Sequence, residues 1–342
     1  MSRKCVIGVD LGGTNVRAQA IFEDGTIAGE FKKNSSFAQQ GTEAIVDAVV
    51  NTIREAATHL EAEVIGVGLA VPGHTDDRAG IIRWAPNLGR EVDGVFLSWR
   101  DVPLKKMLED QLDFKVTMGN DANLAALGEY RYGSGQNSAS CLVLLTIGTG
   151  IGGGVVLGQN AVMGQASGPL LLIGGNSGGG ELGHTVIQQG GLAANAGTYG
   201  TLEAYCQRDS IVQRAQFKVQ RTKSKIWDLV EGNLSRITPQ IVAEAASQGD
   251  LVGVEVYQEI GSFMGVGVGS FINVFAPEVV AIGGQIAKTG DVLMDSIRAS
   301  ARNVAIPSLM QDCKIVAAEL LDDAGIKGAA ALAFQTFAPS AS

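Results

Sequence analysis

The sequence has few aromatic residues and little positive charge, and both shortages narrow the range of functions. Aromatic residues make up 6% of the 342 residues, too few for the stacking surfaces that hold single-stranded nucleic acid. Lysine and arginine total 26 against 35 aspartates and glutamates, which gives a net charge of -9. No long basic run that could displace counterions from a duplex is present. We therefore expect no nucleic-acid partner.

Paired cysteines and long apolar segments are also lacking. None of the four cysteines belongs to a Cys-x-x-Cys pair, which predicts reduced thiols and an intracellular protein. The longest apolar stretch, residues 260–275, is too short and too rich in glycine to span a bilayer. The first apolar run reaches Asp10 too early for a signal peptide. We expect a cytoplasmic protein with no membrane partner.

Glycine, by contrast, is abundant, with 46 residues that follow no low-complexity period. Between the glycine turns, apolar runs typical of strands alternate with segments of helical periodicity, which predicts an α/β fold. Strands are expected at residues 5–9, 16–22, 26–31, 64–71, 115–118, 142–147, 155–157, 278–282 and 314–317. Helices are expected at residues 42–60, 103–112, 120–132, 199–215, 225–231, 239–247, 251–275 and 326–337. Three glycines spaced four residues apart, in the 251–275 helix, predict close packing against a neighbouring element.

An internal repeat suggests how these elements are organised. The segments IGVDLGGTNVRAQAI at residues 7–21 and LLTIGTGIGGGVVL at 144–157 share one plan of apolar strand, polar residue, glycine hairpin and apolar strand. We therefore expect two related α/β domains, residues 1–119 and 120–324, with a last helix at 325–340 that returns to the first domain. Such an arrangement would place two glycine hairpins on opposite walls of an interdomain cleft.

Each glycine hairpin is a candidate phosphate site, because only glycine lets the backbone N–H groups approach phosphate oxygens closely. Thr14 adds a hydroxyl donor, and Asp10 could hold Mg²⁺ through water. An ordinary turn explains one such hairpin equally well, whereas two in related halves favour a polyphosphate ligand. The residues concerned are Asp10, Gly12, Gly13, Thr14, Asn15, Thr146, Gly148, Thr149 and Gly150.

Asn120 and Asp121 lie between a predicted strand and a predicted helix. Either residue could simply cap the helix, which is the commonest role at this position. Alternatively, Asp121 points into the cleft and accepts the proton of an attacking hydroxyl, a task that needs no strong base in phosphoryl transfer. The two phosphate hairpins favour the catalytic interpretation.

Further along, Glu181, His184 and Glu203 could bind the hydroxyl groups of a sugar with directional hydrogen bonds. A surface turn is the alternative for the first two. Pro72-Gly73 and residues 86–89 are turn signals at strand ends, where the binding loops of α/β folds gather.

Several segments in a fixed order resemble the ROK (repressor, open reading frame, kinase) family, and its bacterial glucokinases in particular. They are DLGGTN at 10–15, the Pro72-Gly73 turn, WRDVPLKKMLEDQL at 99–112, NDANLAALGE at 120–129, TIGTGIGGG at 146–154 and GELGH at 180–184. The resemblance extends from residue 6 to about residue 334. It implies a two-domain actin-like ATPase fold with an interdomain cleft, and a homodimer. It also implies transfer of the ATP γ-phosphate, with Mg²⁺, to the 6-hydroxyl of a hexose, of which glucose is the first candidate.

The same resemblance assigns roles to individual residues. Asp121 becomes the catalytic base. The sugar would be bound by Gly73, Asn87, Asn120, Asp121, Glu181, His184 and Glu203. Residues 12–15 and 148–150 would hold the phosphates, and Gly283-Gly284 would lie beside the adenosine.

This chain departs from the family pattern in three places. The family carries a Cys-Gly-Cys-Gly-x-x-Gly-Cys segment that binds zinc, and residues 194–201 here read ANAGTYGT, which offers no thiolate. We therefore predict no zinc site, with Glu203 positioned by packing instead. Residues 164–180 and 89–97 are extra segments; the first could be a lid, an oligomer contact or a packing device, and the second adjoins the expected sugar loop.

Other functions stay open at this point. A sugar-responsive repressor or sensor of the same family would carry an N-terminal DNA-binding segment, whereas the first hairpin here begins about ten residues from the start. A kinase that acts on an N-acetylhexosamine, a polyphosphate donor in place of ATP, and an ATPase with a non-sugar partner are further alternatives. Sequence does not fix the hexose, because loop placement decides which hydroxyl pattern a pocket accepts.

Overall fold

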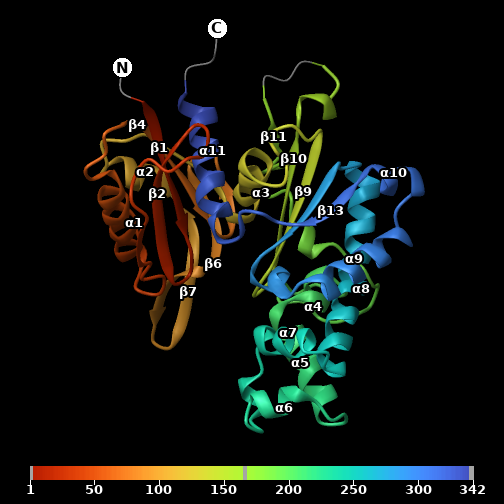
Figure 1. Cartoon of the computed structure of the whole chain (residues 1–342). Helices are drawn as coiled ribbons and strands as arrows, with labels where there is room; N and C mark the ends of the chain where they lie inside the picture. Colours follow the sequence, from red (N-terminus) through yellow and green to blue (C-terminus); the bar gives the residue numbers. More distant parts are fainter. Residues whose placement is uncertain (1–2, 165–167, 339–342) are drawn as a thin grey trace.

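The computed structural model describes residues 3–164 and 168–338. Within these ranges the strands form two five-stranded sheets, which lie side by side in Figure 1, and one three-stranded sheet. The first sheet has the order β3-β2-β1-β4-β8, with β1 Lys4–Leu11, β2 Asn15–Phe22, β3 Lys32–Ser35, β4 Glu63–Val71 and β8 Val116–Asn120. The second has the order β11-β10-β9-β12-β13, with β9 Cys141–Ile147, β10 Ile151–Leu157, β11 Leu170–Leu171, β12 Val279–Gly283 and β13 Lys314–Ala317.

The two sheets share one topology. In the first, β1 pairs antiparallel with β2 and parallel with β4. In the second, β9 pairs antiparallel with β10 and parallel with β12. The outer strands correspond as well, because β3 and β11 are antiparallel edges while β8 and β13 are parallel ones. The sequence repeat at residues 7–21 and 144–157 is therefore the central hairpin of each sheet.

Helices cover both faces of the first sheet. Helix α1 (Thr42–Ala57) buries Ile45, Val49 and Ile53 against one face, which explains why β1 and β4 are apolar nearly throughout. The last helix, α11 (Ala324–Phe337), lies on the other face despite its distance in sequence (Figure 1). A Cβ on Gly68 of β4 would lie 1.9 Å from the Ala329 carbonyl oxygen, so this close approach requires glycine.

Helix α3 (Asp121–Tyr132) lies where the two sheets meet (Figure 1). Its residues share one buried cluster with α11 on one side and with β9 and β10 on the other. A Cβ on Gly328 of α11 would lie 1.7 Å from the Leu124 carbonyl oxygen, so α3 and α11 are in backbone contact. The N-terminus of α3 is therefore held from both halves of the molecule.

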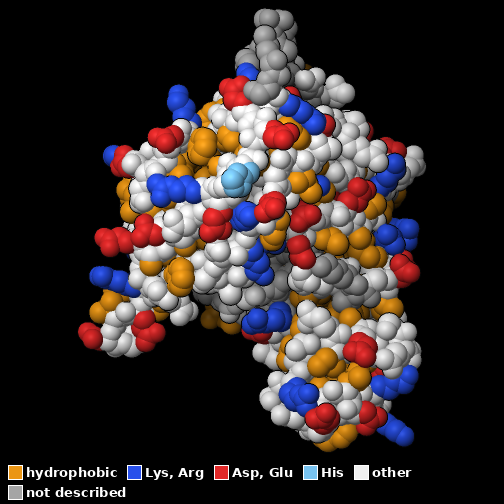
Figure 2. Space-filling model, turned by 60° about the vertical axis from the view of Figure 1, so that its left-hand side comes forward, with side chains coloured by type: hydrophobic (Ala, Val, Ile, Leu, Met, Phe, Trp, Pro, Cys, Tyr) orange, Lys and Arg blue, Asp and Glu red, His pale blue; other side chains and the backbone are white. Residues whose placement is uncertain are grey.

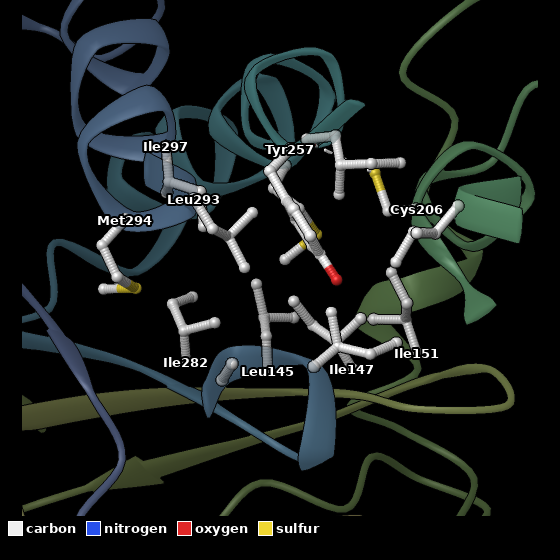
Figure 3. Close-up of a cluster of buried hydrophobic side chains, with 14 of the residues drawn as sticks. Leu145, Ile147, Ile151, Cys206, Tyr257, Ile282, Leu293, Met294 and Ile297 are labelled. Carbon is white, nitrogen blue, oxygen red and sulfur yellow. Dashed lines mark hydrogen bonds between the residues drawn. The ribbon is translucent and has the colours of Figure 1, made fainter. Parts of the chain in front are cut away.

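The second sheet is covered by a layer of helices that forms a large apolar core. Figure 3 shows Leu145, Ile147 and Ile282 from the sheet facing Tyr257 and Leu293 from the helices. Tyr257 is 1% exposed and its hydroxyl donates to the Pro239 carbonyl at 2.7 Å, so its polar atom is satisfied within the core. These helices are α4 Leu202–Cys206, α5 Arg208–Val219, α6 Lys225–Leu229, α7 Pro239–Ser247, α8 Leu251–Phe275, α9 Asp291–Arg302 and α10 Pro307–Asp312.

The predicted close packing of the glycine stripe is confirmed, and its partner is α9. A Cβ on Gly261, Gly265 or Gly269 would lie 2.3 to 2.6 Å from side-chain carbons of α9 or of the turn that follows it. Side chains of any size at these positions would push the two helices apart. The stripe is therefore a packing feature.

The sequence did not predict the three-stranded sheet of β5 His74–Asp76, β6 Ile81–Val92 and β7 Val95–Val102. The extra residues 89–97 form the distal end of its β6–β7 hairpin. Helix α2 (Leu104–Glu109) follows the end of β7 in sequence. Residues 86–89, read as a turn, lie within β6 at a register shift between Ala85 and Gly89. The hairpin and the α5–α7 helices project downward as two lobes, and the surface between them is hollowed (Figure 2).

Three other sequence predictions were wrong in detail. Residues 26–31 form no strand beyond one isolated bridge between Ile21 and Ile27. The helix at 199–215 is two helices, α4 and α5, that are separated at Gln207. The strand at 155–157 begins at Ile151 because the second hairpin is tighter than expected.

Among the described helices, none is long and apolar enough to cross a membrane, and the four cysteines are buried and unpaired.

Candidate active site

The first glycine hairpin joins β1 to β2 and exposes its backbone. The Gly12 N–H donates to the Asn15 carbonyl at 2.9 Å, and the Thr14 carbonyl accepts from the Ser36 N–H at 3.0 Å. Gly13 and Thr14 are both exposed, so the tip is open to a ligand. A Cβ on Gly13 would lie 3.8 Å from the Asn87 Cβ. The predicted sugar residue Asn87 therefore adjoins the predicted phosphate residue Gly13.

Asp10 lies on β1 just before this hairpin, opposite Arg17 in the β1–β2 register. The Arg17 guanidinium and the Asp10 carboxylate form an ion pair, and the side chain of Asp10 is 13% exposed. A Cβ on Gly325, in the first turn of α11, would lie 3.2 Å from Asp10 Cγ. The positive end of α11 and Arg17 both stabilise the carboxylate.

The second hairpin joins β9 to β10, and its supports differ. The Gly148 N–H donates to the Gly150 carbonyl at 2.9 Å, and the Gly148 carbonyl accepts from the Arg208 N–H at 2.9 Å. Glu203 is 8% exposed, and its Oε2 accepts from the Ile151 N–H at 2.9 Å. A Cβ on Gly150 would lie 2.4 Å from the same oxygen. Glu203 therefore holds the hairpin from beneath, a role that the sequence did not indicate.

Gly283 and Gly284, predicted to adjoin the adenosine, lie next to this hairpin. Gly283 pairs with Thr146 across β12 and β9. Gly284 has φ +84, and a Cβ there would lie 2.3 Å from the Ile147 carbonyl oxygen. Only glycine fits both the backbone conformation and the close approach, so the end of β12 is a fixed neighbour of residues 146–148.

The question of which residue caps α3 has a clear answer. Asn120 is the N-cap: its Oδ1 accepts from the Ala122 and Asn123 N–H groups at 3.0 Å each. Its Nδ2 donates to the Gly73 carbonyl at 3.0 Å, which ties the Pro72-Gly73 turn to the helix. Asp121 is the first residue of the helix and accepts from the Ala122 N–H at 2.8 Å. Asn120 thus caps the helix, and the second carboxylate oxygen of Asp121 takes no part in capping.

The pKa of Asp121 is raised to about 7. Burial is the largest cause, followed by the negative charge of Asp10, and Glu181 adds a smaller effect. The hydrogen bond from Ala122 acts in the opposite direction. Asp10 and Glu181 are therefore each close enough to repel Asp121, although all three are far apart in sequence. A carboxylate with a pKa near neutral is suited to accept a proton from a substrate.

Asp121 also lies between the two hairpins. On one side it is close to Asp10, which precedes the first hairpin. On the other, the neighbouring residue Ala122 packs on Gly152 of the second: a Cβ on Gly152 would lie 2.7 Å from the Ala122 Cβ and 2.8 Å from Thr146 Oγ1. The geometry therefore brings one weakly basic carboxylate to two exposed glycine turns.

Glu181 and His184 lie at either end of a short 3-10 turn, Leu182–His184. Glu181 Oε2 is 3.9 Å from His184 Nε2. Among the described residues His184 Nδ1 is buried without a hydrogen-bond partner. The nearby Asn123 donates from Nδ2 to the Gly179 carbonyl at 3.3 Å. His184 thus offers one unsatisfied ring nitrogen, and Glu181, with half of its side chain exposed, is available to a ligand.

The segment that replaces the zinc-binding pattern is held by main-chain and side-chain hydrogen bonds. Val186 bridges Thr201, and Ala193 bridges Tyr199. The Tyr205 hydroxyl accepts from the Leu192 N–H at 3.0 Å. Nowhere in residues 3–164 and 168–338 do three or more His, Cys, Asp or Glu side chains gather so as to hold a metal ion. The donor set of residues 194–201 therefore does not suit zinc.

Asp10 fits a different metal, Mg²⁺. Its carboxylate oxygens are of the kind that Mg²⁺ prefers, one of them pairs with Arg17, and Asp121 lies nearby. Because these residues form no closed cage, Mg²⁺ would arrive with water and substrate phosphates completing its shell. This arrangement agrees with an indirect role for Asp10.

The structure thus links most of the predicted site residues in pairs. Those pairs are Asn87 with Gly13, Asn120 with Gly73, Asp121 with Asp10 and Glu181, His184 with Glu181, Glu203 with Gly150, and Gly283 with Thr146. Sequence reasoning missed Arg17, whose position opposite Asp10 follows from the hairpin register, and Asn123, for which no sequence signal exists.

Comparison with known proteins shows which family the chain resembles. The ROK family model matches residues 6–336. A glucokinase from Thermotoga maritima is 33% identical over 332 residues, which are 97% of this chain and 98% of that protein. A xylose repressor from Caldicellulosiruptor bescii is 26% identical, and the match covers 96% of this chain and 77% of that protein.

Among solved structures, a ROK family glucokinase from Streptomyces griseus, in complex with glucose and AMPPNP, superposes with a TM-score of 0.79. It is 32% identical, and the match covers 97% of this chain and 99% of that one. The predicted two-domain actin-like ATPase fold is confirmed by this likeness and by the duplicated sheets. The chain belongs to the ROK family.

Proposed function

We propose that this protein is an ATP-dependent hexokinase that transfers the γ-phosphate to the 6-hydroxyl of a hexose, most naturally glucose. The observation that carries the proposal is the position of Asp121, a partly buried carboxylate with a pKa of about 7, between two exposed glycine hairpins. A phosphoryl transfer site needs phosphate donors on two sides and one group that orients the attacking hydroxyl. The family relationship to glucokinases supports the same assignment.

In this proposal the two hairpins bind the phosphates with backbone N–H groups. The Gly12 and Gly148 N–H groups close the two turns, the other N–H groups of residues 12–15 and 148–150 donate to the phosphate oxygens, and the Thr14 and Thr149 side chains, both exposed, add hydroxyl donors. Gly283-Gly284 adjoins the adenosine end. Mg²⁺, when bound near Asp10, neutralises charge on the β- and γ-phosphates. ATP is the donor that we propose, since the related Streptomyces griseus structure contains its analogue AMPPNP.

The sugar is bound on the other side of Asp121. Gly73, Asn87 and Asn120 approach it from the first half of the chain, and Glu181 and His184 from the second. Glu203 acts through the second hairpin, because its carboxylate is committed to the Ile151 N–H. Asp121 orients the 6-hydroxyl and accepts its proton as the new O–P bond forms and the bond to the β-phosphate oxygen breaks, releasing ADP.

The test is a coupled assay of ADP release across hexoses and N-acetylhexosamines, with ATP and then polyphosphate as donor. Glucose-dependent ADP release that requires Mg²⁺ is the expected result. Turnover with an N-acetylhexosamine alone would change the substrate class from hexoses to N-acetylhexosamines. Release of ADP that no sugar affects would contradict the proposal. A family relationship to a repressor makes a sugar-responsive sensor the second candidate; it requires sugar binding without turnover, together with salt-sensitive binding to DNA.

Four further properties belong to this proposal. We infer a homodimer and a cytoplasmic location, as expected of a bacterial-type sugar kinase of this family. We also infer independence from zinc, supported by the hydrogen-bonded segment in place of the cysteine pattern. Two domains, divided near Asn120 and closing on the substrates, fit the position of α3 between the sheets. Light scattering and the thermal stability of the protein in chelator test the first and third of these.

A further inference from the structure

Residues 170–180, the described end of the extra segment 164–180, leave the second sheet and reach the first half of the molecule. Residues 165–167 of that segment lie outside the described residues. β11 pairs with β10 through Leu170 and Leu171, and the Leu172 N–H donates to the Val155 carbonyl at 2.9 Å. The chain then turns back, and the Gly179 N–H donates to the Ile173 carbonyl at 2.9 Å. We call residues 170–180 the strap.

Two hydrogen bonds join the tip of the strap to the β5 region. His74 Nε2 lies 2.8 Å from the Asn176 carbonyl oxygen, and because a carbonyl only accepts, the ring nitrogen donates. Ser177 Oγ donates to Asp77 Oδ1 at 2.9 Å, a charge-assisted bond of the stronger kind. The partners are 102 residues apart in sequence in the first contact and 100 in the second. Both contacts therefore connect elements from different halves of the chain.

The backbone of the tip is shaped for this contact. Ser177 has φ +59, a left-handed conformation that a residue other than glycine adopts only when its surroundings hold it there. A Cβ on Gly178 would lie 3.1 Å from His74 Nε2, so a side chain there would crowd the ring. The strained serine and the adjacent glycine are both explained by the contact with β5.

Both attachment points lead directly to predicted sugar residues. His74 follows Gly73, whose carbonyl is held by Asn120. At the other end, Gly180 precedes Glu181, and Asn123 of α3 binds the Gly179 carbonyl. The strap therefore fixes the distance between the two sets of residues that approach the sugar from opposite halves. In the part of the chain that the structure describes, no hydrogen bond of the strap reaches residues 12–15 or 148–150, which would hold ATP.

We propose that Ser177, Asp77 and His74 are positioning residues that hold the two sides of the sugar site in register through the strap. This inference rests on the proposed function. Losing a strap contact lets Gly73 and Glu181 move relative to each other, which weakens sugar binding. The phosphate hairpins keep their own supports, so binding of ATP is left as it was. The strap thus acts on one substrate and not on the other.

The test compares Ser177→Ala, Asp77→Ala and the double variant with the unmodified enzyme. Each single variant raises KM for glucose about fivefold, the effect of losing one hydrogen bond of typical net strength, while kcat and KM for ATP stay within about twofold. Because the two side chains act through one bond, the double variant is no worse than the worse single variant. Asp77→Asn, whose amide oxygen still accepts from Ser177, restores most of the affinity.

Matched controls remove similar groups elsewhere. Ser270→Ala deletes a hydroxyl that bonds within α8, and Asp295→Ala deletes the exposed partner of Arg298 on α9; both leave KM for glucose unchanged. Additive effects of Ser177→Ala and Asp77→Ala, or KM values that match these controls, overturn the proposal.

Hydrogen exchange gives a readout that does not depend on turnover. Glucose slows exchange of the amides in residues 170–180 of the unmodified protein, and Asp77→Ala abolishes this protection. If no sugar supports ADP release, the proposed function fails. The exchange experiment with glucose still shows whether the strap responds to sugar binding. Exchange that is unaffected by glucose, or equally affected in Asp77→Ala, rules out a positioning role.

Discussion

The two glycine hairpins occupy the same place in the same topology, yet the residues that flank them differ in a consistent way. Asp10 on β1 is paired in register with Arg17 on β2. At the corresponding place in the second sheet, Thr146 on β9 is paired with Gly152 on β10. One half therefore carries a pair of charges, and the other carries a hydroxyl beside a residue with no side chain.

The difference shows how a duplicated scaffold supports an asymmetric reaction. Because Gly152 has no side chain, α3 packs directly on β10 through Ala122, which brings Asp121 between the halves. Because the first half carries Asp10 there, the larger of the two charges that add to burial in raising the pKa of Asp121 comes from the opposite side. The common topology provides two phosphate turns, and the divergence between them provides the base. Four predictions test this comparison.

Asp121→Asn has the largest expected effect. The amide keeps the shape of the side chain, and its oxygen still accepts from the Ala122 N–H group, but it takes up no proton. We expect kcat to fall by about 10³-fold, within the usual range for loss of a general base, with KM for both substrates changed little. Stopped assays with coupled ADP detection measure this loss. Normal turnover in Asp121→Asn would mean that the duplicated turns alone carry catalysis.

The same substitution is expected to stabilise the protein free of ligands, and the gain depends on pH. The pKa of Asp121 is about 7 in the folded state against about 4 for an unperturbed aspartate. Between these values the folded state binds more protons than the unfolded state, so the stability of the unmodified protein falls as pH rises. The advantage of Asp121→Asn is therefore absent below about pH 4 and complete above about pH 7, with an upper bound of about 4 kcal/mol.

Urea unfolding of both proteins at pH 5, 6 and 8 measures that dependence. The difference in the free energy of unfolding grows from the lowest pH to the highest. An exposed aspartate, such as Asp295 changed to asparagine, shows no such trend and serves as the control. A constant difference across this range would show that Asp121 is ionised in the fold at ordinary pH.

A pair of glycine substitutions separates packing from phosphate binding in the second hairpin. A Cβ on Gly152 would lie 2.7 Å from Ala122, whereas one on Gly148 would meet nothing within 4 Å. Gly152→Ala should lower the free energy of unfolding by about 1 to 3 kcal/mol through overpacking. Gly148→Ala should leave stability nearly unchanged and raise KM for ATP, because its methyl group occupies space next to the phosphates. Equal melting temperatures for the two variants would contradict the packing role of Gly152.

The duplication, most of the sheet strands and the position of each glycine turn within a hairpin were predictable because they depend on local patterns. Apolar runs of strand length and glycine between them appear directly in residues 7–21 and 144–157. The β6–β7 hairpin was not predictable in the same way, since its exposed strands lack a clear alternation and the turn signal at residues 86–89 is a bulge within β6. Residues 26–31 have strand-like composition, but their backbone pairs with β2 only at residues 26–28, around the isolated bridge between Ile21 and Ile27.

Contacts between distant segments were also beyond sequence reasoning. The identity of the helix cap was decided by the Gly73 carbonyl, which gives Asn120 a third hydrogen bond and leaves Asp121 for another role. The commitment of Glu203 to the Ile151 N–H likewise depends on how α4 packs beneath the hairpin. A carboxylate that could bind sugar and one that supports a backbone turn look the same in a sequence.

Substitutions of Glu203 have the smallest expected effect, and they test how the second hairpin is supported. Glu203→Gln keeps an oxygen that can accept from the Ile151 N–H and loses only the charge, so KM for ATP should rise about twofold to threefold. Glu203→Ala leaves a buried N–H without a partner, which costs about 1 to 3 kcal/mol and should raise KM for ATP about tenfold. A larger change in KM for glucose than for ATP in both variants would instead place the carboxylate on the sugar, and the two hairpins would then be supported by backbone contacts alone.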